Sequence, residues 1–314
     1  MNVVRGLDGI ACDPGSVVTV GTFDGVHLAH REIIREVVSR ARMKEGRSVV
    51  VTFDPHPRQV LGGASTVRLL TTLEERIPLI ETLGVDELLV IPFTYEFSRL
   101  SSREFYETYV VKGIGVREVI VGYDHMFGRD RQGGIEELVR MGQEYDFSVF
   151  AVHPYAVDGE TVSSTLIRNA LALGDMERAR KFLGRPYTLA GRVVKGEQRG
   201  RTIGYPTANV NANDELKAVP ADGVYLAGVA TESGNYFGMM NIGVRPTVAG
   251  ATRRTIEVHL FDFSGDLYDR NIEITFLQKL RQEMTFASLE ELKAQLHRDK
   301  EQSLQLIAAH TQRK

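Results

Sequence analysis

The chain has 314 residues, of which 43% are hydrophobic and 25% charged, and its formal net charge is -3 with a pI near 6.3. This length exceeds one typical domain, so we expect two. The charge argues against non-specific nucleic-acid binding as the main activity. No apolar run reaches membrane-spanning length. The N-terminus lacks the apolar core of a signal peptide, and the single cysteine, Cys12, cannot form an internal disulfide, so we expect a cytoplasmic protein.

The first predicted strand, residues 16–20, is followed by the sequence GTFDGVHLAH, residues 21–30. His27 and His30 lie three residues apart where a helical pattern begins, which puts both imidazoles on one face at a helix N-terminus. Gly21 and Gly25 let a bulky polyanion approach the backbone. We interpret this stretch as a nucleotide phosphate site whose histidines donate to charge on a phosphoryl group. A surface histidine pair and a zinc site are the alternatives, although zinc needs three or four ligands.

Helices and strands then alternate as far as residue 152. Helices are predicted over residues 29–44, from a cap at Thr71 or Thr72 to residue 83, and over residues 101–112; strands are predicted over residues 48–53, 86–93, 118–122 and 147–152. Such alternation is typical of a parallel sheet with crossover helices, which binds ligands beyond the C-terminal ends of its strands. Three loops that leave those ends carry unusual residues: GTFDGVH, DPHP and YDHMFGRDRQGG. We expect them to converge on one site.

The motif VSSTLIR, residues 162–168, opens a further helix. The hydroxyls of Ser163 and Ser164 and the guanidinium of Arg168 one turn later suit the oxygens of a triphosphate. An ordinary serine-capped helix with a solvated arginine is the alternative.

The pattern changes after a short helix, residues 175–183, and a linker at residues 183–186. Short strands are predicted over residues 189–194, 224–230, 236–242, 255–262 and 271–280, which favours a small antiparallel barrel. Ser288 and Glu291 are typical of the start of a final helix that could lie on this barrel.

Three segments of this half stand out. One is MNIGVRPT, residues 240–247, a strand that ends in a rigid loop and could equally be plain barrel scaffolding. The loop GEQRGRTIGYPTAN, residues 196–209, is suited to cover phosphates, and Thr207 and Asn209 offer neutral oxygen ligands for Mg²⁺. A plain turn is the alternative. In the strand TIEVHLFDF, Ile256, Val258 and Leu260 should face the barrel interior and Glu257 and His259 outward, so Glu257 is either a general base or a solvated carboxylate.

The motifs GTFDGVHLAH, TFDPHP, VGYDHMFG and VSSTLIR together resemble the adenylyltransferase half of bacterial bifunctional FAD synthetases over the first ~180 residues. GRTIGYPTAN, NIGVRPT, IEVHLFDF and GDLYD look like the riboflavin kinase half of the same family. The resemblance implies an α/β Rossmann-like nucleotidyltransferase domain (1–183, FMN adenylyltransferase) followed by a small six-stranded flavokinase-like β-barrel with a C-terminal helix (184–314, riboflavin kinase). Three residues, Ala29, His125 and Asp269, depart from the family pattern.

The resemblance also assigns roles to residues. The catalytic residues would be Glu257, His27 and His30. The nucleotide-binding residues would be Gly21, Phe23, Asp24, Gly25, Ser163, Ser164, Thr165, Arg168, Gly196, Gly200, Arg201, Gly204 and Pro206. The flavin-binding residues would be Phe53, His56, Pro57, Asp124, Phe127, Arg245 and Arg281, and the metal ligands Thr207 and Asn209.

The predicted function is phosphorylation of riboflavin to FMN followed by adenylylation of FMN to FAD. ATP is the expected substrate in both domains, Mg²⁺ the expected metal, and FMN and FAD serve as product and substrate. No nucleic-acid or membrane partner is expected. The alternatives are a chain with only one active half, a non-enzymatic flavin or nucleotide sensor, and a nucleotidyltransferase for another small molecule.

Overall fold

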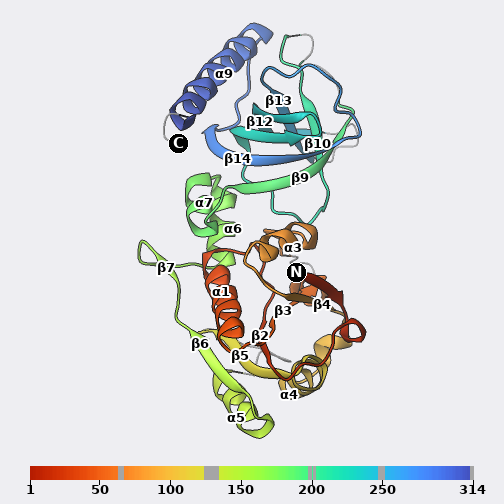
Figure 1. Ribbon diagram of the computed structural model, residues 1–314. Coiled ribbons are helices and arrows are strands. Elements are labelled where there is room, and N and C mark those ends of the chain that lie inside the picture. Colours follow the sequence, from red (N-terminus) through yellow and green to blue (C-terminus); the bar gives the residue numbers. More distant parts are fainter. Residues whose placement is uncertain (63–66, 124–133, 197–199, 201–202, 247–251, 312–314) are drawn as a thin grey trace. The chain divides into compact units, whose positions relative to one another are not determined.

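The structure is a computed structural model that describes residues 1–62, 67–123, 134–196, 200, 203–246 and 252–311 (Figure 1). It consists of two compact units, residues 1–164 and residues 165–314. The predicted domain boundary at residue 183 differs from this division by two helices, and the extent of each functional domain stays a prediction.

The first unit is built on a six-stranded, wholly parallel sheet. Its strands are β1 (Asn2–Arg5), β2 (Ser16–Val20), β3 (Ser48–Asp54), β4 (Glu87–Pro92), β5 (Val116–Gly122) and β6 (Ser148–Val152). Their order in the sheet is β1-β4-β3-β2-β5-β6. The chain moves outward from β2 to β3 and β4, then returns to β5 on the other side of β2. The order therefore reverses between β2 and β5, where open α/β sheets bind their ligands.

Helices cover both faces of this sheet. They are η1 (Leu7–Gly9), α1 (Leu28–Met43), α2 (Pro57–Leu61), α3 (Leu73–Glu81), η2 (Phe97–Arg99), α4 (Ser102–Phe105), the π-helix η3 (Tyr106–Ile114) and α5 (Ile135–Tyr145). Ile34 of α1 and Ile80 of α3 pack on Val50, whereas η3 and α5 pack on Val49 and Val51 of the same strand. Alternate valines of one strand thus enter opposite cores, which explains the continuous apolar runs of these strands.

The predicted elements of this unit are confirmed, including capping boxes at Thr72–Glu75 and Ser101–Glu104. The sequence interpretation omitted β1, α2, α5 and a hairpin of β7 (Ala156–Val157) and β8 (Glu160–Thr161). Most of these elements are short. The edge strand β1 has four residues, of which only one is buried, so its sequence shows little periodicity.

The second unit begins in α6 (Ser164–Leu173), whose first residue belongs to the first unit, and continues through α7 (Met176–Leu183). Six strands follow: β9 (Tyr187–Val194), β10 (Ala208–Ala212), β11 (Gly223–Thr231), β12 (Gly234–Pro246), β13 (Thr252–Leu260) and β14 (Asn271–Arg281). They form a closed antiparallel barrel in the order β10-β13-β12-β11-β14-β9. Closure removes both sheet edges, so every strand has two neighbours.

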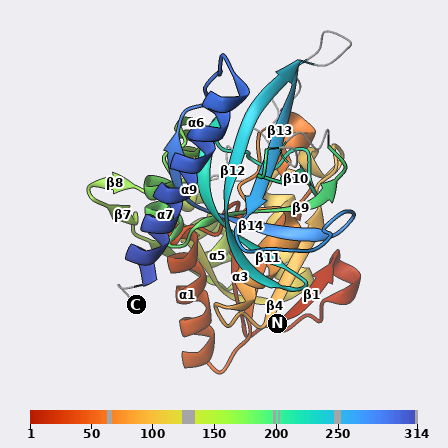
Figure 2. The ribbon, with the colours of Figure 1, turned by 90° about the horizontal axis from the view of Figure 1, so that it is seen from above.

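The final helix, α9 (Leu289–Thr311), lies along the barrel and contacts β12 and β14 (Figure 2). Ser288 accepts a hydrogen bond from the Glu291 amide, as the predicted cap requires. Among the barrel strands, β10 is the one that the sequence does not predict, and its first two residues fall within the predicted loop of residues 196–209. Asp269, which departs from the family pattern, has a positive φ of 62°, a conformation that glycine favours and aspartate tolerates.

Candidate functional sites

The turn after β2 carries the histidine pair at the point where the sheet order reverses. His27 caps α1, and its Nδ1 accepts the amide N–H of His30 at 3.3 Å. This bond leaves Nε2 as the proton-bearing nitrogen of a neutral His27. The two rings stack with centroids 3.5 Å apart, and Phe23 meets His30 edge-on at 5.3 Å. The predicted pair thus lies at a helix N-terminus, where backbone N–H groups favour an anion.

A buried network fixes the shape of this turn. The Asp24 carboxylate, 1% exposed, accepts the amide N–H groups of Leu70 and Thr71 at 2.9 and 3.0 Å. The Thr71 hydroxyl accepts the Gly25 amide at 2.9 Å, and Gly25 adopts φ +89°. Asp24 and Gly25 therefore shape the turn through residues on the approach to α3. Their contacts with a nucleotide stay a prediction.

Arg76 of α3 lies beneath the same loops and is 2% exposed. Its guanidinium donates to the Thr52 hydroxyl at 3.0 Å and to the Thr71 carbonyl at 3.4 Å. Burial lowers the pKa of Arg76 from its ordinary value, while Asp24 and Asp54 oppose that shift. Arg76 thus links the end of β3 to the turn after β2. Sequence reasoning missed it, because an arginine in an amphipathic helix is normally solvent-exposed.

The loop after β3 holds two of the predicted flavin contacts. His56 caps α2, with Pro57 in the first turn, and its Nδ1 accepts the Arg58 amide at 3.1 Å. Phe53, at the end of β3, lies against Phe93 and Phe97 with ring centroids 5.7 and 5.9 Å away. Because β3 and β2 are parallel neighbours in the sheet, the loop after β3 and the histidine turn after β2 lie at the same edge of the sheet.

The remaining predicted residues of the first site are only partly described. The Ser164 hydroxyl donates to the Asp24 carbonyl at 2.9 Å, which ties the start of α6 to the turn. Ser163 precedes that helix, and Thr165 and Arg168 lie in its first turns. Asp124 and Phe127 fall outside the described residues, as does His125. Their roles and those of Ser163, Thr165 and Arg168 stay predictions.

The second candidate site is a lateral row of side chains on the outer side of the barrel. Glu257 of β13 is paired with Asn209 of β10 on one side and with Asn241 of β12 on the other. Asn241 is paired with Val224 of β11, which is paired with Arg281 of β14. Residues paired directly across strands point to the same side of a sheet, so these five residues from five strands share one face.

The predicted orientation of β13 is confirmed by burial. Ile256, Val258 and Leu260 are 7% exposed or less, and Glu257 and His259 alternate with them. A helix partly covers the outward face, however, and Glu257 is half-buried. A cavity of about 530 Å³ lies over it, with the polar row on one wall and Leu289, Leu292 and Leu296 of α9 on the other. Concave sites with an apolar wall and a few polar groups are typical of small-molecule binding.

Thr207, Asn209 and Glu257 come together in this cavity. The Thr207 hydroxyl donates to Glu257 Oε2 at 3.3 Å, and Asn209 lies opposite Glu257 in the strand register. A Cβ at Gly196 would collide with the Asn209 side-chain amide. The glycine is therefore needed for Asn209 to occupy its place, which gives Gly196 a steric role beside any contact with phosphate.

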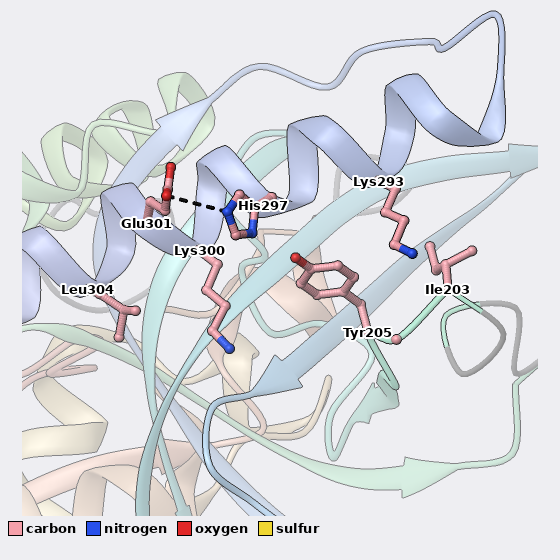
Figure 3. Close-up of a pocket in the computed structure, with 8 residues that line it drawn as sticks. Ile203, Tyr205, Lys293, His297, Lys300, Glu301 and Leu304 are labelled. Carbon is pink, nitrogen blue, oxygen red and sulfur yellow. Dashed lines mark ion pairs between the residues drawn. The ribbon is translucent and has the colours of Figure 1, made fainter.

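The loop of residues 203–207 separates that cavity from a second one. The second cavity, about 430 Å³, lies between Ile203, Gly204 and Tyr205 and the α9 residues Lys293, His297, Lys300, Glu301 and Leu304 (Figure 3). In Figure 3 the Tyr205 ring points from its loop toward α9. Gly200 accepts the Tyr205 amide at 2.9 Å, and Gly204 adopts φ +84°. Arg201 lies outside the described residues.

His259 faces this loop from β13. It is 9% exposed, and its Nδ1 lies 2.8 Å from the Pro206 carbonyl oxygen. Burial lowers the pKa of His259 from its ordinary value, the Pro206 hydrogen bond opposes the shift, and the charge of Lys300 adds to it. The imidazole is therefore neutral at pH 7.

Arg281 makes a different contact from the one predicted for it. Its Nε and Nη2 both donate to Asp299 of α9, at 2.8 to 3.1 Å, and Asp299 is 1% exposed. Gln295 also donates to Asp299. This fork attaches α9 to the barrel next to the cavity, and a flavin contact by Arg281 stays a prediction. The Arg245 backbone lies in β12, and its side chain is outside the described part.

Sequence reasoning missed Asn241 and Asp299 as well as Arg76. Asn241 stands in the motif MNIGVRPT, but its place beside Glu257 depends on a strand register that period-two alternation does not fix. Asp299 has a weak signal, an acidic residue in the middle of an amphipathic helix on its buried side.

The described residues contain neither a cluster of metal-ligating side chains nor a membrane-spanning helix. No group of three or more His, Cys, Asp or Glu side chains could hold a metal ion among them. In the same part of the chain, no helix is both long and apolar enough to cross a membrane. The predicted metal ligands Thr207 and Asn209 have neutral oxygens and are not of these four residue types.

Comparison with known proteins matches each half of the chain to a family model. The FAD synthetase family model matches residues 10–166, and the Riboflavin kinase family model matches residues 183–307. The bifunctional riboflavin kinase/FMN adenylyltransferase of Pseudomonas fluorescens is 42% identical over 300 residues, 95% of this chain and 96% of the relative. The protein of the same name from Escherichia coli K12 is 38% identical over 302 residues, 95% of this chain and 96% of the relative.

A solved structure also matches the whole fold. It is described as a macrolide-efflux protein from Streptococcus pneumoniae, and it aligns with a TM-score of 0.87 and 33% sequence identity over 96% of this chain and 98% of its own.

Proposed function

Since this chain belongs to the bifunctional riboflavin kinase/FMN adenylyltransferase family, we propose that it phosphorylates riboflavin to FMN and then adenylylates FMN to FAD, with ATP as the substrate of both steps. The observation that carries the kinase step is the row of Asn209, Glu257 and Asn241 beside Thr207 in a cavity under α9. For the adenylyl step it is the His27–His30 pair at the end of β2.

In the kinase step, Glu257 acts as general base. The ribityl 5′-hydroxyl of riboflavin is a poor nucleophile near neutral pH, and the carboxylate accepts its proton as the oxygen attacks the γ-phosphorus of ATP. A new oxygen–phosphorus bond forms, the bond from the γ-phosphorus to its bridging oxygen breaks, and ADP leaves. The Thr207 hydroxyl, 3.3 Å from Glu257 Oε2, keeps the carboxylate in one orientation.

Mg²⁺ is the metal we propose for this site. Thr207 and Asn209 would hold it, because neutral oxygens beside a carboxylate are hard ligands that leave positions for phosphate oxygens. When bound, Mg²⁺ supplies positive charge to the transferring phosphoryl group. We propose Mg²⁺-ATP as the substrate of the adenylyl step too.

The adenylyl step needs no base, because the FMN phosphate is already an anion. It attacks the α-phosphorus of ATP, and pyrophosphate leaves. We assign His27 and His30 to charge on the α-phosphate and the leaving group, and Ser164 and Arg168 to the β- and γ-phosphates. The loops that carry Phe53, His56, Pro57, Asp124 and Phe127 are assigned to FMN.

We propose residues 1–183 as the adenylyltransferase domain and residues 184–314 as the kinase domain. The assigned nucleotide-binding, flavin-binding and metal-binding residues are those predicted from the sequence. The cytoplasm is the proposed place of both reactions, in keeping with a single cysteine, Cys12, and with ATP as substrate.

The test incubates the chain with riboflavin and Mg²⁺-ATP and separates riboflavin, FMN and FAD. Wild type should produce FMN and then FAD, with ADP and pyrophosphate. Glu257→Gln should remove most FMN formation while FAD formation from supplied FMN persists. His30→Ala should do the reverse, with a loss of about 10²- to 10³-fold in FAD formation. An unchanged kinase rate in the first variant, or an unchanged FAD rate in the second, contradicts the corresponding assignment.

A further inference from the structure

His259 of β13 is a buried histidine that has no role in either proposed reaction. Its ring lies between two aromatic neighbours: Tyr205 at 5.3 Å with an interplanar angle of 67°, and Phe261 at 5.9 Å with an angle of 71°. It also lines the cavity that holds Glu257. The ring is therefore held in one orientation by packing on both sides.

The polar contact of His259 determines which of its nitrogens carries a proton. A carbonyl oxygen only accepts hydrogen bonds, so the Nδ1 that lies 2.8 Å from the Pro206 carbonyl must be the donor. Proline has no backbone N–H, and the carbonyl is its one main-chain group for hydrogen bonding. His259 thus holds the residue that immediately precedes Thr207.

Two neighbouring outward residues of β13 therefore contact two consecutive residues of the loop. Glu257 accepts the Thr207 hydroxyl, and His259 donates to Pro206. Residues i and i+2 of a strand point the same way, so the spacing of these contacts is fixed by the strand itself. The second contact therefore adds a constraint on the loop residue that immediately precedes Thr207.

We propose that His259 is a positioning residue for the kinase step, which aligns Pro206 and Thr207 so that the Thr207 hydroxyl faces both Glu257 and the bound Mg²⁺-ATP. The proposal rests on the proposed kinase function of this cavity. His259 touches neither metal nor substrate in it, and acts through the loop backbone. Partners that orient a metal ligand typically change metal affinity or activity about 10- to 100-fold when they are removed.

The test compares His259→Leu with His259→Asn. The two replacements have nearly the same shape, but only the Asn amide keeps a donor at the position of Nδ1. For the full chain, one measures the KM for ATP, the half-saturating Mg²⁺ concentration and the kcat of the kinase reaction. FAD formation from supplied FMN is measured in the same samples as an internal control. Phe261→Leu removes an aromatic neighbour of His259 and leaves the Pro206 bond in place, so it is the matched packing control.

We expect His259→Leu to raise the half-saturating Mg²⁺ concentration or the KM for ATP about 10- to 100-fold, with FAD formation unchanged. His259→Asn should recover most of the loss, and Phe261→Leu should change the melting temperature more than the Mg²⁺ dependence. If His259→Leu does not fold, His259→Thr, whose side chain is too short to reach Pro206, replaces it. A lower melting temperature with unchanged Mg²⁺ and ATP dependence would overturn the proposal. Absence of kinase activity in wild type would instead overturn the proposed function.

Discussion

The contact between Arg281 and Asp299 gives a prediction about how α9 is held on the barrel. Asp299 is 1% exposed and Arg281 17% exposed, and three donor–acceptor distances between them lie from 2.8 to 3.1 Å. Removal of one partner of a buried ion pair costs about 3–5 kcal/mol, because the other charge stays buried without compensation. Since Arg281 keeps some access to water, we expect Asp299→Leu to cost about 3 kcal/mol, the lower end of that range.

Arg281→Met should cost at least as much, because it leaves the more deeply buried partner charged. The double variant Arg281→Met/Asp299→Leu should cost less than either single change, since replacing both charges by apolar groups is often nearly neutral. The coupling energy of the cycle, the sum of the two single costs minus the cost of the double variant, should then exceed about 3 kcal/mol. For a unit of this size, a loss of 3 kcal/mol lowers the melting temperature by about 6–12 °C.

Hydrogen exchange of the amides in residues 289–311 is the appropriate assay, because it reports the opening of α9 within the full chain. Thermal melts of the wild type and the three variants complete the cycle. A coupling energy below about 0.5 kcal/mol would refute the reasoning, since that is the additivity expected of independent sites. A fall in riboflavin affinity confined to the Arg281 variants would favour the flavin contact that the sequence predicted for Arg281.

Three further predictions test local features. A Cβ at Gly200 would collide with the Tyr205 carbonyl, so Gly200→Ala should lower the free energy of unfolding by about 1–3 kcal/mol. It should also reduce kinase turnover while FAD formation from supplied FMN persists, and kinase kinetics equal to those of wild type would contradict this. Arg76→Met removes charged hydrogen bonds to Thr52 and to the Thr71 carbonyl, and should cost about 2–3 kcal/mol in urea unfolding and slow only the adenylyl step. Burial raises the pKa of Tyr225 to about 12 from an ordinary 10.0. Its contribution to stability is thus present below pH 10 and lost as pH rises toward 12, and Tyr225→Phe should flatten the alkaline fall of the melting temperature.

The sequence predicted most of the fold because its periodicities are strong. The valine runs of β2 and β3 are continuous since the sheet is covered on both faces, and the capping boxes at Thr72 and Ser101 mark helix starts through their own hydrogen bonds. These signals depend on interactions between residues that are close together in the sequence. The short strand β10 has no such signal, because its five residues follow directly on a loop rich in turn residues.

The candidate sites show a different limit. Motifs identified His27, Glu257 and Thr207, since each stands in a pattern whose chemistry can be read from residue type and spacing. They did not reveal that Asn241 lies beside Glu257, because barrel register is set by closure and by packing between strands far apart in the chain.

The supporting residues were hidden for the same reason. His259 and Arg76 donate hydrogen bonds to the backbone carbonyls of Pro206 and Thr71. Any residue type offers a backbone carbonyl, so the sequence contains no pair of side chains that would indicate these contacts. A motif search finds groups that meet substrate, because chemistry limits their types. Groups that hold a loop are limited only by reach and burial, which the fold alone supplies. A buried polar side chain that donates to the backbone next to a proposed ligand is therefore the feature to examine first when such a site is tested by substitution.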